Sequence, residues 1–387
     1  MGVLFLSIPY VYAETAKEYV DRGIVYYKQS NFPQAIADYT KAIVIDPNYA
    51  KAYCGRGLAY SIQGNFPQAI ADYTKAIVID PNYAKAYYDR GLAYYKQGNF
   101  TQAISDFTKA IEINPNYADA YYGRGLAYGD QGNFTQAIAD YTKAIEINPK
   151  YADVYNNRGI VYGKQGNFTQ AILDFNKAIA INPKLAEAYN NRGLAYANQG
   201  NFTQAIADYN KAIEINPKNV QAYSNRGFAY DKQGKFPQAI LDLTKAIAIN
   251  VSSIAADYNN RGFAYDKQGK FPQAISDYSK AIEINPNFVE AYYGRGLAYE
   301  KQGNFSQAIA DFTKVIEINP KYAEAYCGRG LCYYAKKEYE KAWLHVITRQ
   351  SYPNSGSVYL VLPKIRQLWN FSIPQMAELL CAAWSGV

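Results

Sequence analysis

The chain has 387 residues, of which 49% are hydrophobic, and a formal net charge of +7. A charge this mild, without a long run of Lys and Arg, argues against a nucleic-acid-binding patch. A single histidine excludes a His-rich metal site, and we expect neither a metal nor a cofactor.

The first 15 residues allow two interpretations. Residues 3–12 are largely apolar, and Val11-Tyr12-Ala13 resembles a signal-peptidase site with Glu14 as the mature start. A normal export signal begins with a basic region, and none precedes this stretch. The segment is either an export signal of an exported or periplasmic protein, or an apolar segment that packs on the first repeat of a cytoplasmic one. No later stretch of about 18 apolar residues predicts a membrane span.

A repeat of 34 residues occupies residues 16–352. The pair Arg-Gly recurs ten times, and eight of the nine spacings are 34 residues, while the spacing from Arg226 to Arg261 is 35. A fixed period of this size indicates an array of identical supersecondary units. We take residues 84–117 as the type repeat and number its places from Ala84 as place 1.

Each repeat is predicted to form two antiparallel helices joined by a short turn. In the type repeat, apolar residues at helical spacing end at Gly98, which can take a positive φ and close the first helix. The second half begins at Phe100 and ends before Asn114-Pro115, because proline cannot continue a helix.

The period and the residue pattern resemble the tetratricopeptide repeat family. That family has a large residue at place 4, Gly at 8, Tyr at 11, Ala at 20, an aromatic residue at 24, Ala at 27 and Pro at 32. Here Tyr at places 4 and 11, Gly at place 8 and Ala at place 20 occur in all ten repeats. The resemblance implies an all-α fold, an α-solenoid in which helix-turn-helix repeats form a right-handed superhelix.

The last part of the chain departs from the pattern. One extra residue lies within residues 251–254, where Val251 replaces the expected Pro, and predicts a local change in stacking angle. The tenth repeat has Lys337 in place of the turn Gly and Arg349 in place of a small Ala, so we expect it to cap the array. Residues 353–387 fall outside the repeat and are predicted to form one or two capping helices over the last apolar face.

Two opposite charges recur in register. Place 7, usually Leu in the family, is Arg in every repeat, and place 23 is Asp in nine repeats. In a hairpin that turns near places 15 and 16, places whose numbers sum to about 30 face each other, so Arg158 should pair with Asp174. We interpret the pair as an internal strut, with a charged recognition site as the alternative.

The resemblance also implies that first helices line a concave groove with places 2, 5, 6, 9, 12 and 13. Asn recurs at places 5 and 6 in consecutive repeats, and its donor and acceptor suit the backbone of an extended peptide. A similar ladder lines the repeat domain of O-linked N-acetylglucosamine transferases; the alternative is soluble filler copied by repeat duplication. The candidate binding residues are Asn156, Asn157, Asn190, Asn191, Asn225, Asn259 and Asn260.

Place 2 changes sign along the array. It is basic in the first three repeats, at Lys17, Lys51 and Lys85, and mostly acidic afterwards. The basic residues are candidates for binding the acidic end of a partner, or else they are solvated surface charge. No three consecutive repeats carry the carboxylate-clamp residues of chaperone-binding family members, so we do not expect capture of a chaperone C-terminal peptide.

These patterns predict a protein-interaction scaffold that binds a protein or an extended peptide in its groove. The sequence contains no P-loop, GxSxG or HExxH motif, and we expect no enzymatic activity. The alternatives are a helical repeat protein that binds single-stranded nucleic acid, against which the acidic residues at place 2 argue, and an enzyme accessory subunit. The sequence does not indicate the oligomeric state.

Overall fold

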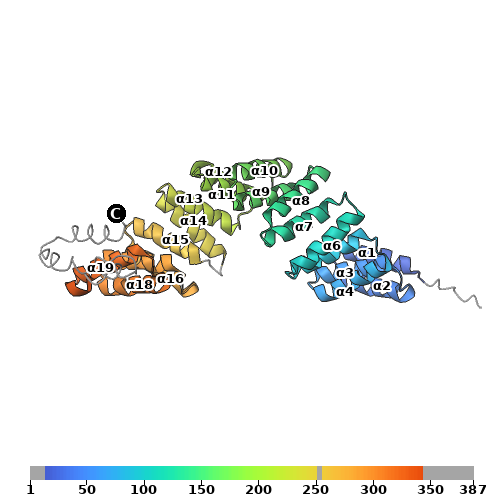
Figure 1. The fold of residues 1–387 in the computed structure, drawn as a ribbon, viewed down its shortest axis with the longest axis horizontal. Helices are drawn as coiled ribbons and strands as arrows, with labels where there is room; N and C mark the ends of the chain where they lie inside the picture. Colours follow the sequence, from blue (N-terminus) through green and yellow to red (C-terminus); the bar gives the residue numbers. More distant parts are fainter. Residues whose placement is uncertain (1–13, 251–254, 343–387) are drawn as a thin grey trace, which may run out of the picture. The chain divides into compact units, whose positions relative to one another are not determined.

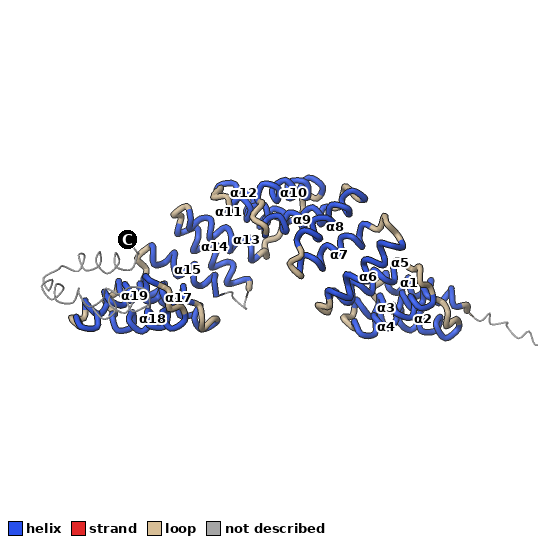
Figure 2. The backbone as a smooth tube through the Cα atoms, in the orientation of Figure 1, coloured by secondary structure: helices blue, strands red, loops and turns tan. Residues whose placement is uncertain are grey.

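The computed structural model describes residues 14–250 and 255–342, and these residues form helices and short loops without strands (Figure 2). The chain divides into two compact parts, residues 1–191 and 192–387, which we call the N-terminal half and the C-terminal half. The predicted all-α fold is confirmed, and so is its construction from paired helices (Figure 1).

Each of the first nine repeats contributes a first and a second helix, and the described part of the tenth repeat contributes its first helix. The first helices are α1 (Ala16–Lys28), α3 (Ala50–Ile62), α5 (Ala84–Lys96), α7 (Ala118–Asp130), α9 (Ala152–Lys164), α11 (Ala186–Asn198), α13 (Val220–Lys232), α15 (Ala255–Lys267), α17 (Val289–Lys301) and α19 (Ala323–Ala335). The second helices are α2 (Phe32–Ile45), α4 (Phe66–Ile79), α6 (Phe100–Ile113), α8 (Phe134–Ile147), α10 (Phe168–Ile181), α12 (Phe202–Ile215), α14 (Phe236–Ile249), α16 (Phe271–Ile284) and α18 (Phe305–Ile318).

The turn between the two helices is set by one residue at place 15. Gly98 has a φ of 76°, a left-handed conformation that costs glycine little because it lacks a Cβ atom. Ser30 and Lys337 occupy the same place and adopt φ values of 58° and 62°. The tenth repeat therefore keeps the turn geometry of the others although it lacks the turn glycine.

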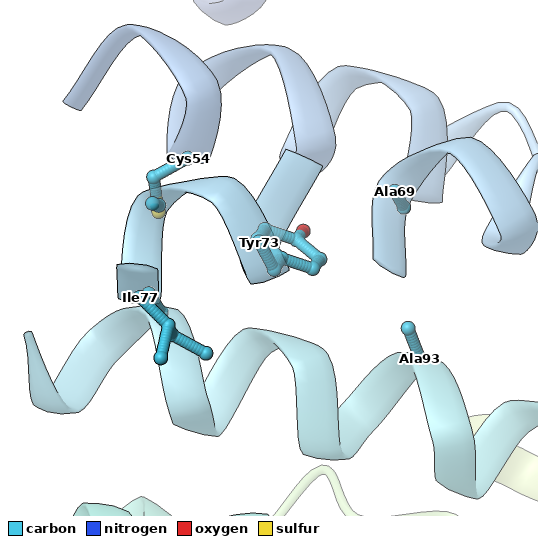
Figure 3. Close-up of a cluster of buried hydrophobic side chains, with 7 residues drawn as sticks. Cys54, Ala69, Tyr73, Ile77 and Ala93 are labelled. Carbon is cyan, nitrogen blue, oxygen red and sulfur yellow. The ribbon is translucent and has the colours of Figure 1, made fainter. Parts of the chain in front are cut away.

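In eight of the first nine repeats the core consists of small residues that surround one large ring at place 24, and in the seventh repeat Leu243 takes the place of the ring. Figure 3 shows the second repeat, where Tyr73 and Ile77 of α4 lie in one buried cluster with Ala69, Cys54 of α3 and Ala93 of α5. Tyr73 is 1% exposed, and both alanines are fully buried. Because the Ala side chain occupies little volume, neighbouring helices approach closely, and the ring at place 24 fills the remaining space.

Four predictions concern residues outside the described ranges. They are the export signal or apolar segment at the N-terminus, the altered stacking at residues 251–254, the effect of Arg349 in the tenth repeat and the capping helices within residues 353–387. Between the seventh and eighth repeats, on either side of residues 251–254, the Arg261 guanidinium donates to the Thr244 hydroxyl at 3.1 Å. Arginines at the same place in other repeats make the equivalent bond to the preceding repeat. Among the described helices, none has the length and apolar character needed to cross a membrane.

Candidate binding surface

The repeated Arg and Asp form the predicted pairs. In nine repeats the guanidinium donates two hydrogen bonds, from Nε and a terminal nitrogen, to the two carboxylate oxygens at 2.6–3.0 Å. Each Asp is only 3–6% exposed. The pairs are Arg22–Asp38, Arg56–Asp72, Arg90–Asp106, Arg124–Asp140, Arg158–Asp174, Arg192–Asp208, Arg226–Asp242, Arg261–Asp277 and Arg295–Asp311.

In seven of the nine struts, a further contact ties the Arg to the preceding repeat. The free terminal nitrogen of Arg158 donates to the Thr142 hydroxyl at 2.9 Å, and this hydroxyl donates in turn to the Ile138 carbonyl at 2.7 Å. The same guanidinium lies over the Tyr155 ring, 5.7 Å from its centroid. These contacts within the protein use all three guanidinium nitrogens of Arg158, and they support the interpretation of the pair as an internal strut.

Some of the candidate asparagines, which we call the asparagine ladder, form hydrogen bonds within the array. In the N-terminal half, the Asn157 amide donates to the Tyr122 hydroxyl at 2.7 Å, and the Asn191 amide donates to Asn156 Oδ1 at 3.1 Å. Asn156 is buried, at 8% exposure, and therefore supports Asn191 instead of facing solvent. Each of these two bonds joins the first helices of adjacent repeats, so Asn157 and Asn191 contribute to packing between repeats as well as to the predicted groove surface.

The remaining asparagines are half-buried on the first helices. Asn190 lies on α11, Asn225 on α13, and Asn259 and Asn260 on α15. Asn259 and Asn260 both line a pocket in the C-terminal half, so this pair has access to a bound group.

The three basic residues differ in their surroundings. Lys17 and Lys51 are exposed. Lys85 bonds instead to its neighbour on α5, with its Nζ 2.8 Å from Asp89 Oδ2. Asp89 is 5% exposed, and burial raises the pKa of its carboxyl. Lys85 therefore serves to neutralise a buried acid, which leaves Lys17 and Lys51 as freely presented charges.

The pocket in the C-terminal half lies along the first helices of three consecutive repeats. It has a volume of about 330 Å³ and is lined mainly by α13, α15 and α17, with the rings of Tyr278 and Tyr322. Places 5, 6, 9, 12 and 13 contribute most of the lining, as expected for groove positions. Sequence reasoning identified Asn259 and Asn260 here but missed the aromatic and acidic residues beside them.

The missed residues are Phe228, Phe263, Asp231 and Asp266. Their signal is a local departure from the repeat: Phe stands at place 9 only in the seventh and eighth repeats, where the others have Leu or Ile. Place 12 is acidic only in the seventh, eighth and ninth repeats. Among the described residues, no group of His, Cys, Asp and Glu is arranged to hold a metal ion.

Comparison with family models decides the identity. A TPR repeat model matches residues 23–64, 57–98, 127–166, 164–200 and 264–303. Two tetratricopeptide repeat models match residues 84–117, 186–219 and 289–322, and residues 107–139, 208–240 and 312–343. The chain belongs to the tetratricopeptide repeat family. Together these matches span residues 23–240 and 264–343, which include nearly all of the helical hairpins.

Several solved structures resemble the chain. A tetratricopeptide repeat protein from Parabacteroides merdae is 21% identical with a TM-score of 0.51, and the match covers 64% of this chain and 98% of the other. PilW, a type IV pilus biogenesis factor, is 20% identical with a TM-score of 0.50, covering 54% and 96%. YrrB, described as having an unusual peptide-binding site, is 27% identical with a TM-score of 0.41, covering 48% and 95%. The first two support the fold alone, and no curated protein matches the chain.

Proposed function

We propose that the chain is a non-catalytic interaction scaffold that binds an extended segment of a partner protein along its first helices. The observation that carries this proposal is the pocket in the C-terminal half, because it is built from three successive first helices. A surface that continues from one repeat to the next suits a linear ligand that passes several repeats, as helical repeat arrays commonly bind.

The contrast between constant and variable places within the repeat supports a binding role. Places that pack the array are nearly invariant, whereas places 5, 6, 9 and 12 differ between repeats. The recurring Arg and Asp residues pair with each other inside the array, as in the bidentate bonds of Arg295 to Asp311 at 2.7 and 2.9 Å. Variation is thus concentrated on the surface that a partner would contact, and we propose that this surface determines partner choice.

The asparagine ladder provides the test. The variant changes Asn157, Asn191, Asn225 and Asn260 to Ala, and the matched control changes the exposed loop residues Asn48, Asn82, Asn116 and Asn287 to Ala. We expect the ladder variant to bind the partner recovered from the source cell at least about tenfold more weakly, because it loses several hydrogen bonds worth about 0.5–1.5 kcal/mol each. The control should bind as the unaltered chain does.

Stability is measured in parallel, because Asn157 and Asn191 also bond to the preceding repeats. We expect a modest fall in melting temperature for the ladder variant, with the full helical content retained by circular dichroism. Equal affinity of the ladder variant and the control would show that the asparagines are only structural.

A further inference from the structure

The pocket of the C-terminal half contains carboxylate oxygens that lack hydrogen-bond donors. Asp266 is 8% exposed; its Oδ2 accepts from Lys301 Nζ at 2.6 Å, but its Oδ1 has no partner. Asp231 Oδ1 and Asn259 Oδ1 are likewise buried without a donor. Three acceptors from two adjacent first helices therefore line one pocket with no donor assigned to them.

The lysines near these acceptors have other contacts. Lys232 lies over the Phe228 ring and Lys267 over the Phe263 ring, each 4.9 Å from the ring centroid. Lys301 is occupied by the second oxygen of Asp266. Two of the three lysines in the pocket thus lie over aromatic rings and the third pairs with Asp266, while one oxygen of Asp231 and one of Asp266 remain without a hydrogen-bond donor.

Leaving such acceptors unpaired is unfavourable. A buried polar group without a partner loses its hydration without compensation, and the loss is greater when the group is charged. Consistent with this, burial raises the pKa of the Asp231 carboxyl although Lys232 and Lys267 act to lower it. A ligand that brings donors and a positive charge would recover this free energy on binding. The occluded oxygens can turn towards it, because the terminal torsion of Asp is broad.

We propose that this pocket binds a basic side chain, preferentially arginine, from the extended segment of the partner. Guanidinium offers five N–H donors in a plane and stacks on aromatic rings, and the pocket supplies both carboxylates and the exposed rings of Phe228 and Phe263. A volume of about 330 Å³ is at the low end for ligand sites, as suits one side chain. The inference rests on the proposed scaffold function and names the chemistry of its partner.

The site is local to the C-terminal half. In the first six repeats place 12 holds Tyr, Ser, Gly or Ala, so the carboxylates that Asp231 and Asp266 supply from this place are absent there. The pocket would therefore fix the position of a partner along the array by anchoring one basic residue, while less specific contacts hold the rest.

The test uses a displayed library of random twelve-residue peptides, selected on the full chain. We expect selected peptides to be enriched in Arg, and to a lesser degree Lys, at one aligned position. Replacing that Arg by neutral citrulline should lower affinity at least about tenfold, because charge-assisted hydrogen bonds are about twice as strong as neutral ones. The double variant Asp231→Asn and Asp266→Asn should show the same loss and no preference for Arg over citrulline.

Two further variants serve as controls for this test. Asp231→Asn alone, which leaves the Lys301 pair with Asp266 intact, should lose affinity in the same direction but less. Glu214→Gln with Glu283→Gln removes the same two charges from exposed positions on α12 and α16 and should bind normally. Melting temperatures measured for all variants show that each is folded.

The outcomes separate the two proposals. Selected peptides without a basic preference, or with equal affinity for the double Asn variant, would overturn the basic-anchor site while leaving the scaffold function standing. An equal loss in the Glu variant would overturn it too, because net charge would then explain the effect. Failure of the chain to select any peptide would count against both.

Discussion

At the scale of single residues, the strut arginine makes more contacts than a surface ion pair. Arg158 gives two hydrogen bonds to Asp174, a third to Thr142 of the preceding repeat, and a ring contact to Tyr155. An exposed pair contributes little to stability, but Asp174 is 3% exposed and the geometry is bidentate. The energetic importance of the pair lies in the cost of breaking one side of it.

This cost can be measured in one repeat. Asp174→Ala leaves a largely buried guanidinium without its carboxylate and should cost about 3–5 kcal/mol. Adding Arg158→Leu removes the orphaned charge and places an apolar side chain there, so the double variant should melt at a higher temperature than the single one. Thermal unfolding followed by circular dichroism decides; equal or greater loss in the double variant would exclude the strut.

The pairing could be predicted because it depends only on the symmetry of one hairpin. Places 7 and 23 lie at equal distances from the turn, and the bonds follow. The contact between Arg158 and Thr142 depends on the offset between successive repeats, which no single repeat contains. For the same reason the sequence placed the asparagines on the groove side but did not show that Asn191 bonds to Asn156.

At the scale of helices, close packing depends on glycine at place 8. A Cβ atom at Gly159 of α9 would lie 2.7 Å from Phe175 Cε1, a distance that side chains do not tolerate. Phe175 is 2% exposed and has little room to move. The invariant glycine is therefore required by the approach of the first helix to the ring of the second, as the sequence pattern indicated.

A matched pair of substitutions within α9 tests this requirement. Gly159→Ala should destabilise the array by about 1–3 kcal/mol through overpacking. Gly163→Ala meets no atom within 4 Å and should stabilise the helix by about 0.5–1 kcal/mol. Denaturant unfolding of both variants provides the measurement, and two substitutions with the same sign would contradict the packing account.

Helix identity and turn position were predictable because proline, asparagine and glycine mark them in nearly every repeat. Two exceptions are instructive: Ser30 and Lys337 lack the freedom of glycine, yet they take φ values of 58° and 62°. At Ser30, where α1 packs against α2, the packing of the hairpin overrides the preference of the residue, which sequence propensity alone does not reveal.

At the scale of the whole molecule, the chain combines a repeated scaffold with a local exception. Successive repeats share their packing residues, so the scaffold could be inferred from self-comparison. The pocket could not, because it depends on three repeats together and on residues such as Phe228 and Asp266 that interrupt the pattern. Departures from a repeat are thus the best sequence guide to the pocket that we propose as a binding site.

The most direct measurement locates the partner on the seventh repeat by photo-crosslinking. A photoreactive benzoylphenylalanine replaces either Phe228 on first helix α13 or Leu241 on second helix α14, both exposed apolar residues at 41% and 63%. If first helices form the binding surface, the partner should crosslink in the source cell from position 228 and not from position 241. Crosslinking from position 241 alone would place the partner on the second helices and contradict the account.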